Sequence, residues 1–278
     1  MVKTEHPGTH AIPLVCDSPH SGTHYPDDFN YAVDFSDLRR CEDTHIEKLW
    51  AAVPRVGGTL IHAVFPRSYT DTNRTEFDID VSMMAGAWPG RTEPSKRCLE
   101  LGNGLIFSQT TTLQPIYDRK LSITEVQHRI HTCWRPYRQA LAQALEGASQ
   151  QHGKRWHLNL HSMPSNAYER LGLPQKVLAD VVLGDLRGAA CSAEFTEFMA
   201  QAFKQRGYSV AINDPYVGMD LLTTHGDPKN QRHSLQIELN RRLYLNEQTR
   251  EPLPQFGQVQ ADITSLLADL ALYVQQQL

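Results

Sequence analysis

Three short polar segments directly follow apolar runs of this sequence, and each carries a side chain that can bind a metal ion or move a proton. These side chains are His20, His161 and Glu238. Ligands of open α/β sheets bind beyond the carboxyl ends of the strands. Two histidines and a carboxylate, with one position open for water, are the usual protein ligands of a hydrolytic zinc site. The pattern therefore favours a metal-assisted hydrolase.

The spacing predicts His20 and His161 as the first two metal ligands. Asp43 is the predicted third ligand, and its neighbours Glu42 and His45 are the alternatives. A single histidine after a strand is more often an ordinary loop or core residue. Several such residues at strand ends in one α/β chain favour a metal site, although no HExxH motif is present.

Other residues are candidates for catalysis or substrate binding. Glu238 is the predicted general base that takes a proton from water. Asn73 and Arg74 follow a predicted strand and suit a substrate carboxylate, although an Asx-type turn with an exposed arginine explains them equally well. Arg135 can reach a substrate, with helix packing as the alternative. His225, like His45, is a candidate to orient ligands or stabilise an oxyanion, with a surface role as the alternative.

Alternating predicted strands and helices must position these residues. Apolar runs predict strands at 11–16, 59–66, 155–160, 180–183, 208–213 and 233–240. Helical spacing predicts helices within 36–53 (beginning at Asp43 or earlier), at 122–146, at 193–207 and at 260–277. Pro136 is expected to kink the second of these or to split it into two helices. Residues 82–115 are predicted as a long loop. The alternation favours one α/β domain over residues 1–278, with a mixed, mostly parallel sheet flanked by helices.

Composition excludes several classes of protein. The 278 residues carry 27 basic and 31 acidic side chains, a net charge of −4, which is not the basic footprint of a nucleic-acid-binding protein. The apolar runs are too short to span a membrane, and the first ten residues lack the apolar core of a signal peptide. Five cysteines without CxxC spacing predict reduced thiols and a cytoplasmic location.

Seven motifs together resemble one known family over about residues 12–250. They are PHSG (19–22), EDTHIEKLW (42–50), DTNR (71–74), LHS (160–162), LGDLRGAACS (183–192), THGDP (224–228) and QIELNRRLY (236–244). In this order they resemble the N-formylglutamate amidohydrolases (deformylases). The resemblance implies hydrolysis of N-formyl-L-glutamate to formate and L-glutamate in histidine degradation. It also implies a zinc ion and a fold similar to that of the zinc carboxypeptidases.

The resemblance to zinc carboxypeptidases also implies roles for single residues. His20 and His161 match the zinc-binding histidines, and Glu238 matches the general base. Asn73 and Arg74 match the pair that binds the terminal carboxylate of the substrate.

The sequence departs from these families at two positions. Thr23 stands where carboxypeptidases have a zinc-binding glutamate, so the third ligand is expected elsewhere, with Asp43 the best-placed acid. Thr224 stands before His225, where deformylases tend to carry an arginine. A related N-acyl amino acid is therefore the alternative substrate.

The sequence thus predicts a metal-dependent amidohydrolase, with zinc the expected metal, that acts on a small acyl amino acid and binds neither nucleic acid nor membrane. Arg67, Arg135 and Arg187 are candidates for a second substrate carboxylate. One alternative is a peptidase-like zinc hydrolase of the same fold, such as a carboxypeptidase or peptidoglycan amidase. The other is a metal-binding or ligand-binding module without catalysis. The acyl group, the native metal and the oligomeric state stay open.

Overall fold

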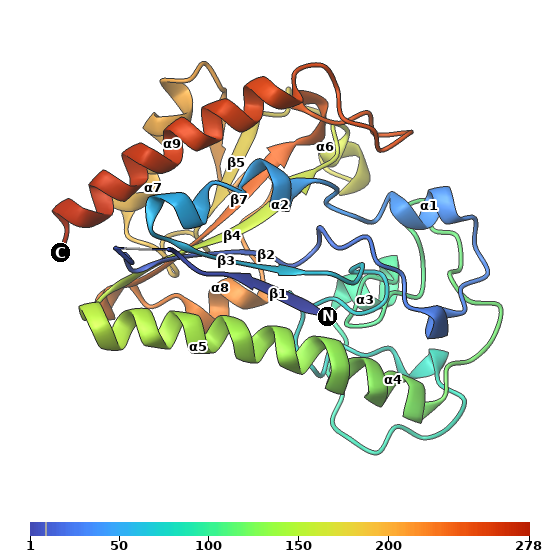
Figure 1. Ribbon diagram of the computed structural model, residues 1–278. Helices are drawn as coiled ribbons and strands as arrows, with labels where there is room; N and C mark the ends of the chain where they lie inside the picture. The colour runs from blue at the N-terminus through green and yellow to red at the C-terminus, as the bar shows by residue number, and fades with distance from the viewer. Residues whose placement is uncertain (9) are drawn as a thin grey trace. The chain divides into compact units, whose positions relative to one another are not determined.

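A seven-stranded sheet with the strand order β1-β3-β2-β4-β7-β5-β6 forms the centre of the fold (Figure 1). The computed structural model describes residues 1–8 and 10–278. β2, β4 and β7 run parallel, whereas β5 pairs antiparallel with β7 and parallel with β6. The prediction of a mixed, mostly parallel α/β sheet is therefore confirmed. The strands are β1 (Val2–Glu5), β2 (Leu14–Ser18), β3 (Thr59–Ala63), β4 (Arg155–Met163), β5 (Val181–Gly184), β6 (Val210–Ile212) and β7 (Arg232–Asn240).

Helices cover the sheet, with α2, α7 and α9 on one face and α8 on the other (Figure 1). The helices are α1 (Phe35–Arg39), α2 (Ile46–Leu49), α3 (Lys96–Leu101), α4 (Ile123–Arg129), α5 (Arg135–His152), α6 (Ala167–Arg170), α7 (Ala193–Lys204), α8 (Asp220–His225) and α9 (Phe256–Gln276). Among the residues that the structure describes, no helix combines the length and apolar character needed to cross a membrane.

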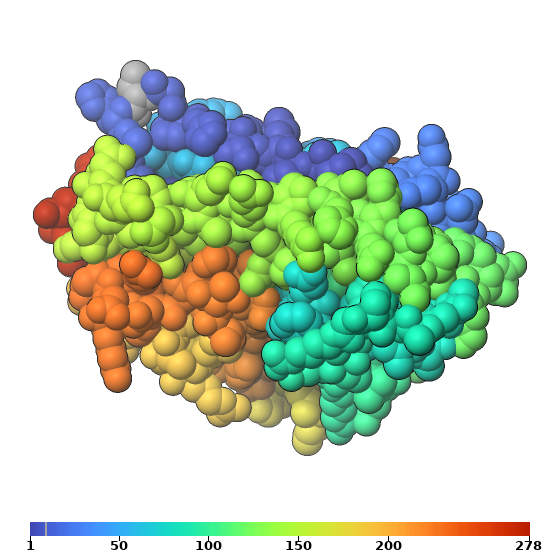
Figure 2. All heavy atoms as spheres, turned by 90° about the horizontal axis from the view of Figure 1, so that it is seen from below, coloured from blue at the N-terminus to red at the C-terminus, as the bar shows by residue number. Residues whose placement is uncertain are grey.

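The chain divides into two compact units. The loop unit comprises Met1–Lys3, Pro19–Thr44 and His62–Ala140, and the sheet unit comprises Thr4–Ser18, His45–Ile61 and Leu141–Leu278. Within the sheet unit, the C-terminal half of α5 lies beside the segment that follows α8 (Figure 2). The expectation of a single domain over 1–278 stays a prediction.

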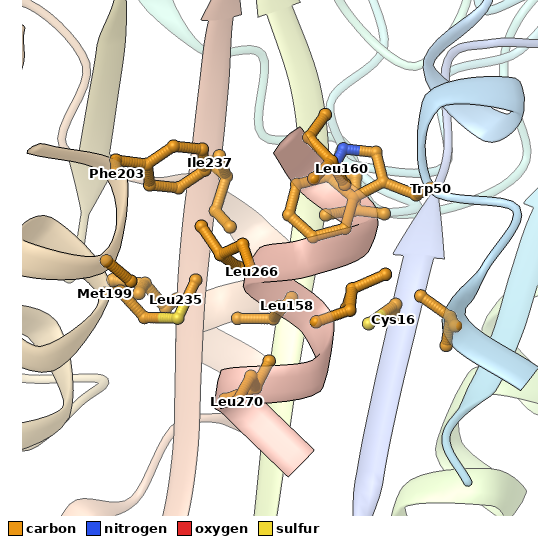
Figure 3. Close-up of a cluster of buried hydrophobic side chains, with 14 of the residues drawn as sticks. Cys16, Trp50, Leu158, Leu160, Met199, Phe203, Leu235, Ile237, Leu266 and Leu270 are labelled. Carbon is orange, nitrogen blue, oxygen red and sulfur yellow. The ribbon is translucent and has the colours of Figure 1, made fainter. Parts of the chain in front are cut away.

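The two central strands β4 and β7 have one apolar face and one polar face. Successive side chains of a strand point to opposite faces of the sheet. Leu158 and Leu160 of β4, with Leu235 and Ile237 of β7, pack against α9 in the main hydrophobic core (Figure 3). The residues that alternate with them along the two strands are polar and buried: His157, Asn159, His161, Ser234, Gln236 and Glu238. The sheet therefore presents buried polar side chains on the face away from α9.

Two strands extend further than predicted, and this changes the setting of their polar residues. β2 continues to Ser18 and β4 to Met163, so Asp17 and His161 lie inside strands and not in the loops after them. The apolar pattern of each strand ends earlier, at Cys16 and at Leu160. Pairing with a neighbouring strand continues past that residue because it uses backbone groups.

The predicted helix within 36–53 is wrong, because α1 and α2 are separate short helices. His45 precedes α2 with φ of 70°, a left-handed conformation that interrupts a helix. Asp43 lies in the turn between the two helices, where its backbone N–H donates to the carbonyl of His20 at 2.9 Å. The periodic apolar spacing of 46–53 is real, but it belongs to shorter pieces.

The predicted kinked helix over 122–146 is confirmed in outline. The Ser122 side chain accepts a hydrogen bond from the backbone N–H of Glu125 at the start of α4, as the capping motif predicts. A π-helical segment, Ile130–Trp134, then separates α4 from α5. Pro136 lacks a backbone N–H, and the wider π turn accommodates it. The predicted loop 82–115 contains the short helix α3.

Candidate metal and catalytic site

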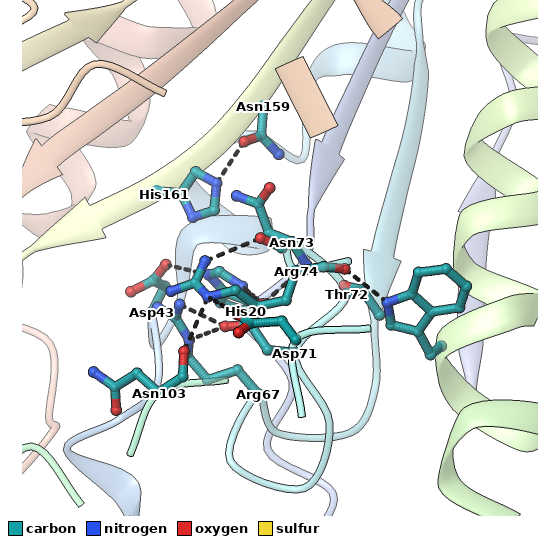
Figure 4. Close-up of polar contacts among 12 residues, drawn as sticks. His20, Asp43, Arg67, Asp71, Thr72, Asn73, Arg74, Asn103, Asn159 and His161 are labelled. Atoms are coloured by element: carbon teal, nitrogen blue, oxygen red, sulfur yellow. Dashed lines mark hydrogen bonds and ion pairs between the residues drawn. The ribbon is translucent and has the colours of Figure 1, made fainter. Parts of the chain in front are cut away.

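In the loop unit, His20 lies between two buried carboxylates. Its Nε2 is 2.7 Å from Oδ1 of Asp71, and its Nδ1 is 3.4 Å from Oδ2 of Asp43 (Figure 4). All three side chains are buried. The loop that carries His20 lies against the backbone of Phe65, and a Cβ at Gly22 would come within 2.1 Å of the Phe65 carbonyl oxygen. This close approach requires glycine and fixes the path of the chain next to His20.

Asp71 is held as a charged carboxylate. Burial acts to raise its pKa, but Arg67, His20 and Arg74 together hold that pKa well below its usual range. Arg67 donates to Oδ2 of Asp71 from Nη2 at 2.8 Å and from Nε at 3.2 Å, and the backbone N–H of Asn73 donates to Oδ1 at 2.9 Å. An ionised carboxylate only accepts hydrogen bonds. The Nε2 of His20 therefore carries the proton that it shares with Asp71.

The donor atoms of this group fit a metal ion. With the proton of a neutral His20 on Nε2, the lone pair of Nδ1 faces a carboxylate oxygen of Asp43, an arrangement that a cation stabilises. Histidines that bind metals usually donate their other N–H to a carboxylate or carbonyl, as His20 does to Asp71. Among the described residues, buried His20, Asp43 and His161 are side chains suited to holding a metal ion.

The two alternatives for the third ligand have other contacts. Glu42 accepts hydrogen bonds from Tyr25 Oη at 2.6 Å and from Thr44 Oγ1 at 2.9 Å. His45 belongs to the sheet unit, and its ring packs edge-on to Phe256 with ring centroids 5.9 Å apart. These contacts favour Asp43, whose role as ligand stays a prediction.

Arg74 is buried, with its guanidinium directed at backbone carbonyls. Nε donates to the carbonyl of Asn103 at 3.0 Å, and Nη1 donates to the carbonyl of Asn73 at 2.9 Å. Burial lowers the pKa of Arg74 to about 10, against the opposing effect of Asp71. The expected Asx-type turn is present, because the backbone N–H of Asn73 donates to Oδ1 of Asp71, but the expectation that Arg74 is exposed in it is wrong. That Asn73 and Arg74 bind a substrate carboxylate stays a prediction.

In the sheet unit, His161 and Glu238 are partners on neighbouring parallel strands. Such strands lie about 4.8 Å apart, and paired residues direct their side chains to the same face. Both side chains are buried, and Glu238 Oε1 accepts a hydrogen bond from Gln236 Nε2 at 3.0 Å. β4 and β7 therefore bring the predicted metal ligand and the predicted base side by side.

A chain of buried polar side chains leads away from His161. Its Nε2 is 2.6 Å from Oδ1 of Asn159 (Figure 4). The Nδ2 of Asn159 donates to Oδ1 of Asp17 at 2.8 Å. His157 Nε2 is 2.8 Å from the same Asp17 oxygen, and its Nδ1 is 2.6 Å from Ser234 Oγ. The sequence reasoning missed Asn159, Asp17 and His157. The signal was present as polar residues at every second position of β4.

The remaining candidates have neighbours of their own. His225 ends α8, where its ring lies edge-on to His157 with centroids 6.1 Å apart. Arg135 is exposed on α5, where it pairs with Glu76 and contacts Nε2 of His131 at 2.9 Å. Arg187 is exposed in a turn with φ of 57°. Their roles in catalysis and substrate binding stay predictions.

A mixed α/β sheet with buried histidines and carboxylates near its strand ends is typical of a metal-assisted hydrolase. Comparisons with known proteins specify the family. The family model of N-formylglutamate amidohydrolase matches residues 12–245. The chain therefore belongs to the N-formylglutamate amidohydrolase family, and it is a hydrolase that acts on an amide bond.

Individual relatives agree with this assignment. A crystal structure of N-formylglutamate amidohydrolase from Ralstonia eutropha JMP134 is 49% identical, with a TM-score of 0.97, over 100% of this chain and 99% of that chain. N-formylglutamate deformylase from Pseudomonas putida is 27% identical over 89% of each chain. The deformylase from Pseudomonas aeruginosa is 25% identical over 85% of this chain and 84% of its own.

Proposed function

We propose that the protein hydrolyses N-formyl-L-glutamate to formate and L-glutamate, as a step of histidine degradation. His20, Asp43 and His161 would hold a divalent metal, zinc by the chemistry of the donor set. The observation that carries the proposal is the pairing of His161 with Glu238 on adjacent strands, in a chain of this family. The buried free thiols of all five cysteines are consistent with a cytoplasmic enzyme.

The covalent connection between the two units supports a joint role for His20 and His161. Asp17 of β2 pairs in register with Asn159 of β4. His20 follows Asp17 by three residues, which an extended chain spans in at most about 11 Å. His161 follows Asn159 by two residues on the neighbouring strand. Both histidines therefore belong to the carboxyl ends of adjacent parallel strands, where ligands of α/β sheets bind.

The metal, the general base and the carboxylate-binding residues have separate roles in the proposed hydrolysis. A divalent metal, when bound, supplies Lewis acidity that polarises the formyl carbonyl and lowers the pKa of a water molecule. Glu238 takes a proton from the attacking water and delivers it to the leaving nitrogen, so that the C–N bond breaks to give formate and the free amine. Arg74, with Asn73, binds a carboxylate of the substrate and so positions the carbonyl.

A hydrolysis assay on zinc-loaded protein tests this function. The substrates are N-formyl-L-glutamate, a neutral N-formyl amino acid and N-acetyl-L-glutamate. We expect the first to be hydrolysed fastest. Activity on the neutral or acetylated compound without activity on N-formyl-L-glutamate would favour a related N-acyl amino acid, in agreement with Thr224 before His225.

Metal content of two variants tests the ligand assignment independently of activity. We expect about one divalent ion per chain in the parent protein and loss of that ion in His20→Ala and in His161→Ala. Elemental analysis measures both. A His161→Ala protein as rich in metal as the parent would exclude His161 as a ligand.

A further inference from the structure

Asp17 and Asn159 form a hydrogen-bonded pair that sets the direction of the next hydrogen bond along β4. Both side chains are fully buried, and both belong to the sheet unit. The amide group of Asn159 turns its N–H toward Asp17, and its Nδ2 donates to Oδ1 of Asp17 at 2.8 Å. The carbonyl oxygen of that amide then faces the opposite way, toward His161.

The orientation of this amide determines which nitrogen of His161 carries a proton. Nε2 of His161 is 2.6 Å from Oδ1 of Asn159, and a carbonyl oxygen only accepts. Nε2 must therefore donate, which leaves the lone pair of a neutral imidazole on Nδ1. A flipped amide would present its N–H to His161 and favour the opposite tautomer.

Asp17 is itself anchored by a second donor. Nε2 of His157 lies 2.8 Å from the Asp17 oxygen that also accepts from Asn159, and Nδ1 of His157 lies 2.6 Å from Ser234 Oγ. A buried carboxylate is tolerated when hydrogen bonds compensate its lost hydration. The register of β2, β4 and β7 positions all these residues. The pairing of the strands therefore determines the direction of the hydrogen bonds between Asp17, Asn159 and His161.

We infer that Asp17, acting through Asn159, is a positioning residue that fixes the Nε2-protonated tautomer of His161 and so prepares Nδ1 to bind a metal. The inference rests on the proposed function only for the binding of a metal at Nδ1, because the tautomer is a property of the metal-free protein. Outer groups of this kind typically change metal affinity by about 10–100-fold when they are lost.

The first test is the protonation of His161 in the metal-free parent protein. Nitrogen NMR of protein labelled at histidine distinguishes the two tautomers, and the spectrum of His161→Gln identifies the signal. We expect the proton on Nε2. A proton on Nδ1 would overturn the inference, whatever the variants show.

Variants at Asp17 and Asn159 then test whether the orientation of the Asn159 amide sets the tautomer of His161. In Asp17→Asn the amide of Asn159 is free to flip, so we expect a shift toward the Nδ1-protonated tautomer and Zn²⁺ affinity weaker by about 10–100-fold in a chelator competition. The double variant Asp17→Asn with Asn159→Asp places a carboxylate beside His161 and an amide donor behind it. We expect this exchange to restore both the tautomer and most of the Zn²⁺ affinity.

A matched control separates positioning from general damage to the fold. Asp185 is also a buried carboxylate of the sheet unit, and it accepts from Thr196 Oγ1 at 3.0 Å and from Asn213 Nδ2 at 2.8 Å. Asp185→Asn should lower stability without changing the tautomer of His161. An unchanged tautomer in Asp17→Asn would overturn the inference. The expected tautomers in a parent protein that binds no Zn²⁺ would uphold the positioning and overturn the proposed metal function.

Discussion

The two units hold their predicted metal-binding histidines by the same kind of contact but with different electrostatics. In the loop unit, Nε2 of His20 donates directly to the charged carboxylate of Asp71, which Arg67 also contacts. In the sheet unit, Nε2 of His161 faces the neutral amide of Asn159, and the charge of Asp17 lies one residue further away. In the sheet unit, the register of β2 and β4 lets a carboxylate act on its histidine through an amide, whereas in the loop unit the carboxylate contacts its histidine directly.

The largest effect tests whether the sheet unit supplies the base. Glu238→Gln removes the group that accepts a proton while keeping its size, and general acid–base catalysis contributes typically about 10²–10⁴-fold. We therefore expect kcat to fall by that factor while metal content stays at the parent level. Steady-state kinetics and elemental analysis measure the two quantities.

Glu251→Gln is the control for this experiment, because Glu251 is an exposed carboxylate after β7. It should leave kcat unchanged. A near-normal kcat in Glu238→Gln would transfer the role of base to another residue, with Asp43 or His225 the next candidates.

The next effect tests whether the loop unit recognises the substrate. Arg74→Ala removes a charge-assisted contact to a carboxylate, which costs about 2–4 kcal/mol in a desolvated site. We expect kcat/KM for N-formyl-L-glutamate to fall by roughly 30- to 1000-fold, by the rule of tenfold per 1.36 kcal/mol. A formamide without carboxylates should be hydrolysed equally poorly by the variant and the parent. Equal losses on both substrates would show that Arg74 supports the fold instead.

The pH dependence of KM provides an independent test of Arg74. Since burial lowers the pKa of Arg74 to about 10, its guanidinium is charged below that pH and becomes neutral as the pH rises through it. Binding of the carboxylate should therefore weaken above about pH 10, and KM should rise there. Arg74→Ala should lack this rise, and an identical pH profile in both proteins would contradict the assignment.

The predictability of the site follows the same division between the units. The polar residues at alternate positions of 155–160 and 233–240 could be recognised because the pleat of a strand forces a period of two. His161 and Glu238 were found by a different criterion, because they stand where apolar runs end and ligands of α/β sheets bind. Asn159 and Asp17 were not found, because their role depends on the pairing of β2 with β4, which no local pattern specifies.

The loop unit was harder to predict for a physical reason. The apolar spacing near Asp43 indicated a helix, but the left-handed conformation of His45 divides that segment, and long-range hydrogen bonds decide its path. Likewise, the sequence is equally compatible with an exposed Arg74. Its burial depends on Asn103, which lies in the long irregular segment. Charge pairs between distant residues leave no periodic trace in a sequence.

A smaller effect tests the charged contact of His20. Asp71→Asn keeps the shape of the side chain but removes the charge that accepts from Nε2 of His20. We expect Zn²⁺ affinity to fall by about 10–100-fold. The loss should equal or exceed that of Asp17→Asn, because Asp71 contacts its histidine directly. A smaller loss in Asp71→Asn would contradict the expectation that the direct carboxylate contact has the larger effect.

Asp71→Asn should also change stability with pH. The pKa of Asp71 is depressed in the folded protein, so its charge stabilises the fold above the ordinary pKa of an aspartate, about 4. This contribution is lost as the pH falls through the depressed value. The free energy of unfolding should therefore be larger in the parent than in the variant at pH 7. This difference should shrink as the pH falls into the acid range.

The smallest effect compares two glycines, one beside His20 and one in the sheet unit. A Cβ at Gly22 would lie 2.1 Å from the carbonyl oxygen of Phe65, whereas a Cβ at Gly147, exposed in α5, meets nothing within 4 Å. Gly22→Ala should cost about 1–3 kcal/mol, because backbone must move to make room. Gly147→Ala should stabilise by about 0.5–1 kcal/mol, because alanine is the better helix former.

Thermal unfolding measures both changes, with about 2–4 °C in Tm expected per kcal/mol for a chain of this size class. Gly22→Ala should also weaken Zn²⁺ binding, since the displaced loop carries His20, whereas Gly147→Ala should leave binding unchanged. A Gly22→Ala protein with parental Tm and Zn²⁺ affinity would show that the loop adapts freely. The position of His20 would then not require the close approach to Phe65, and the contacts with Asp43 and Asp71 would carry more of its positioning.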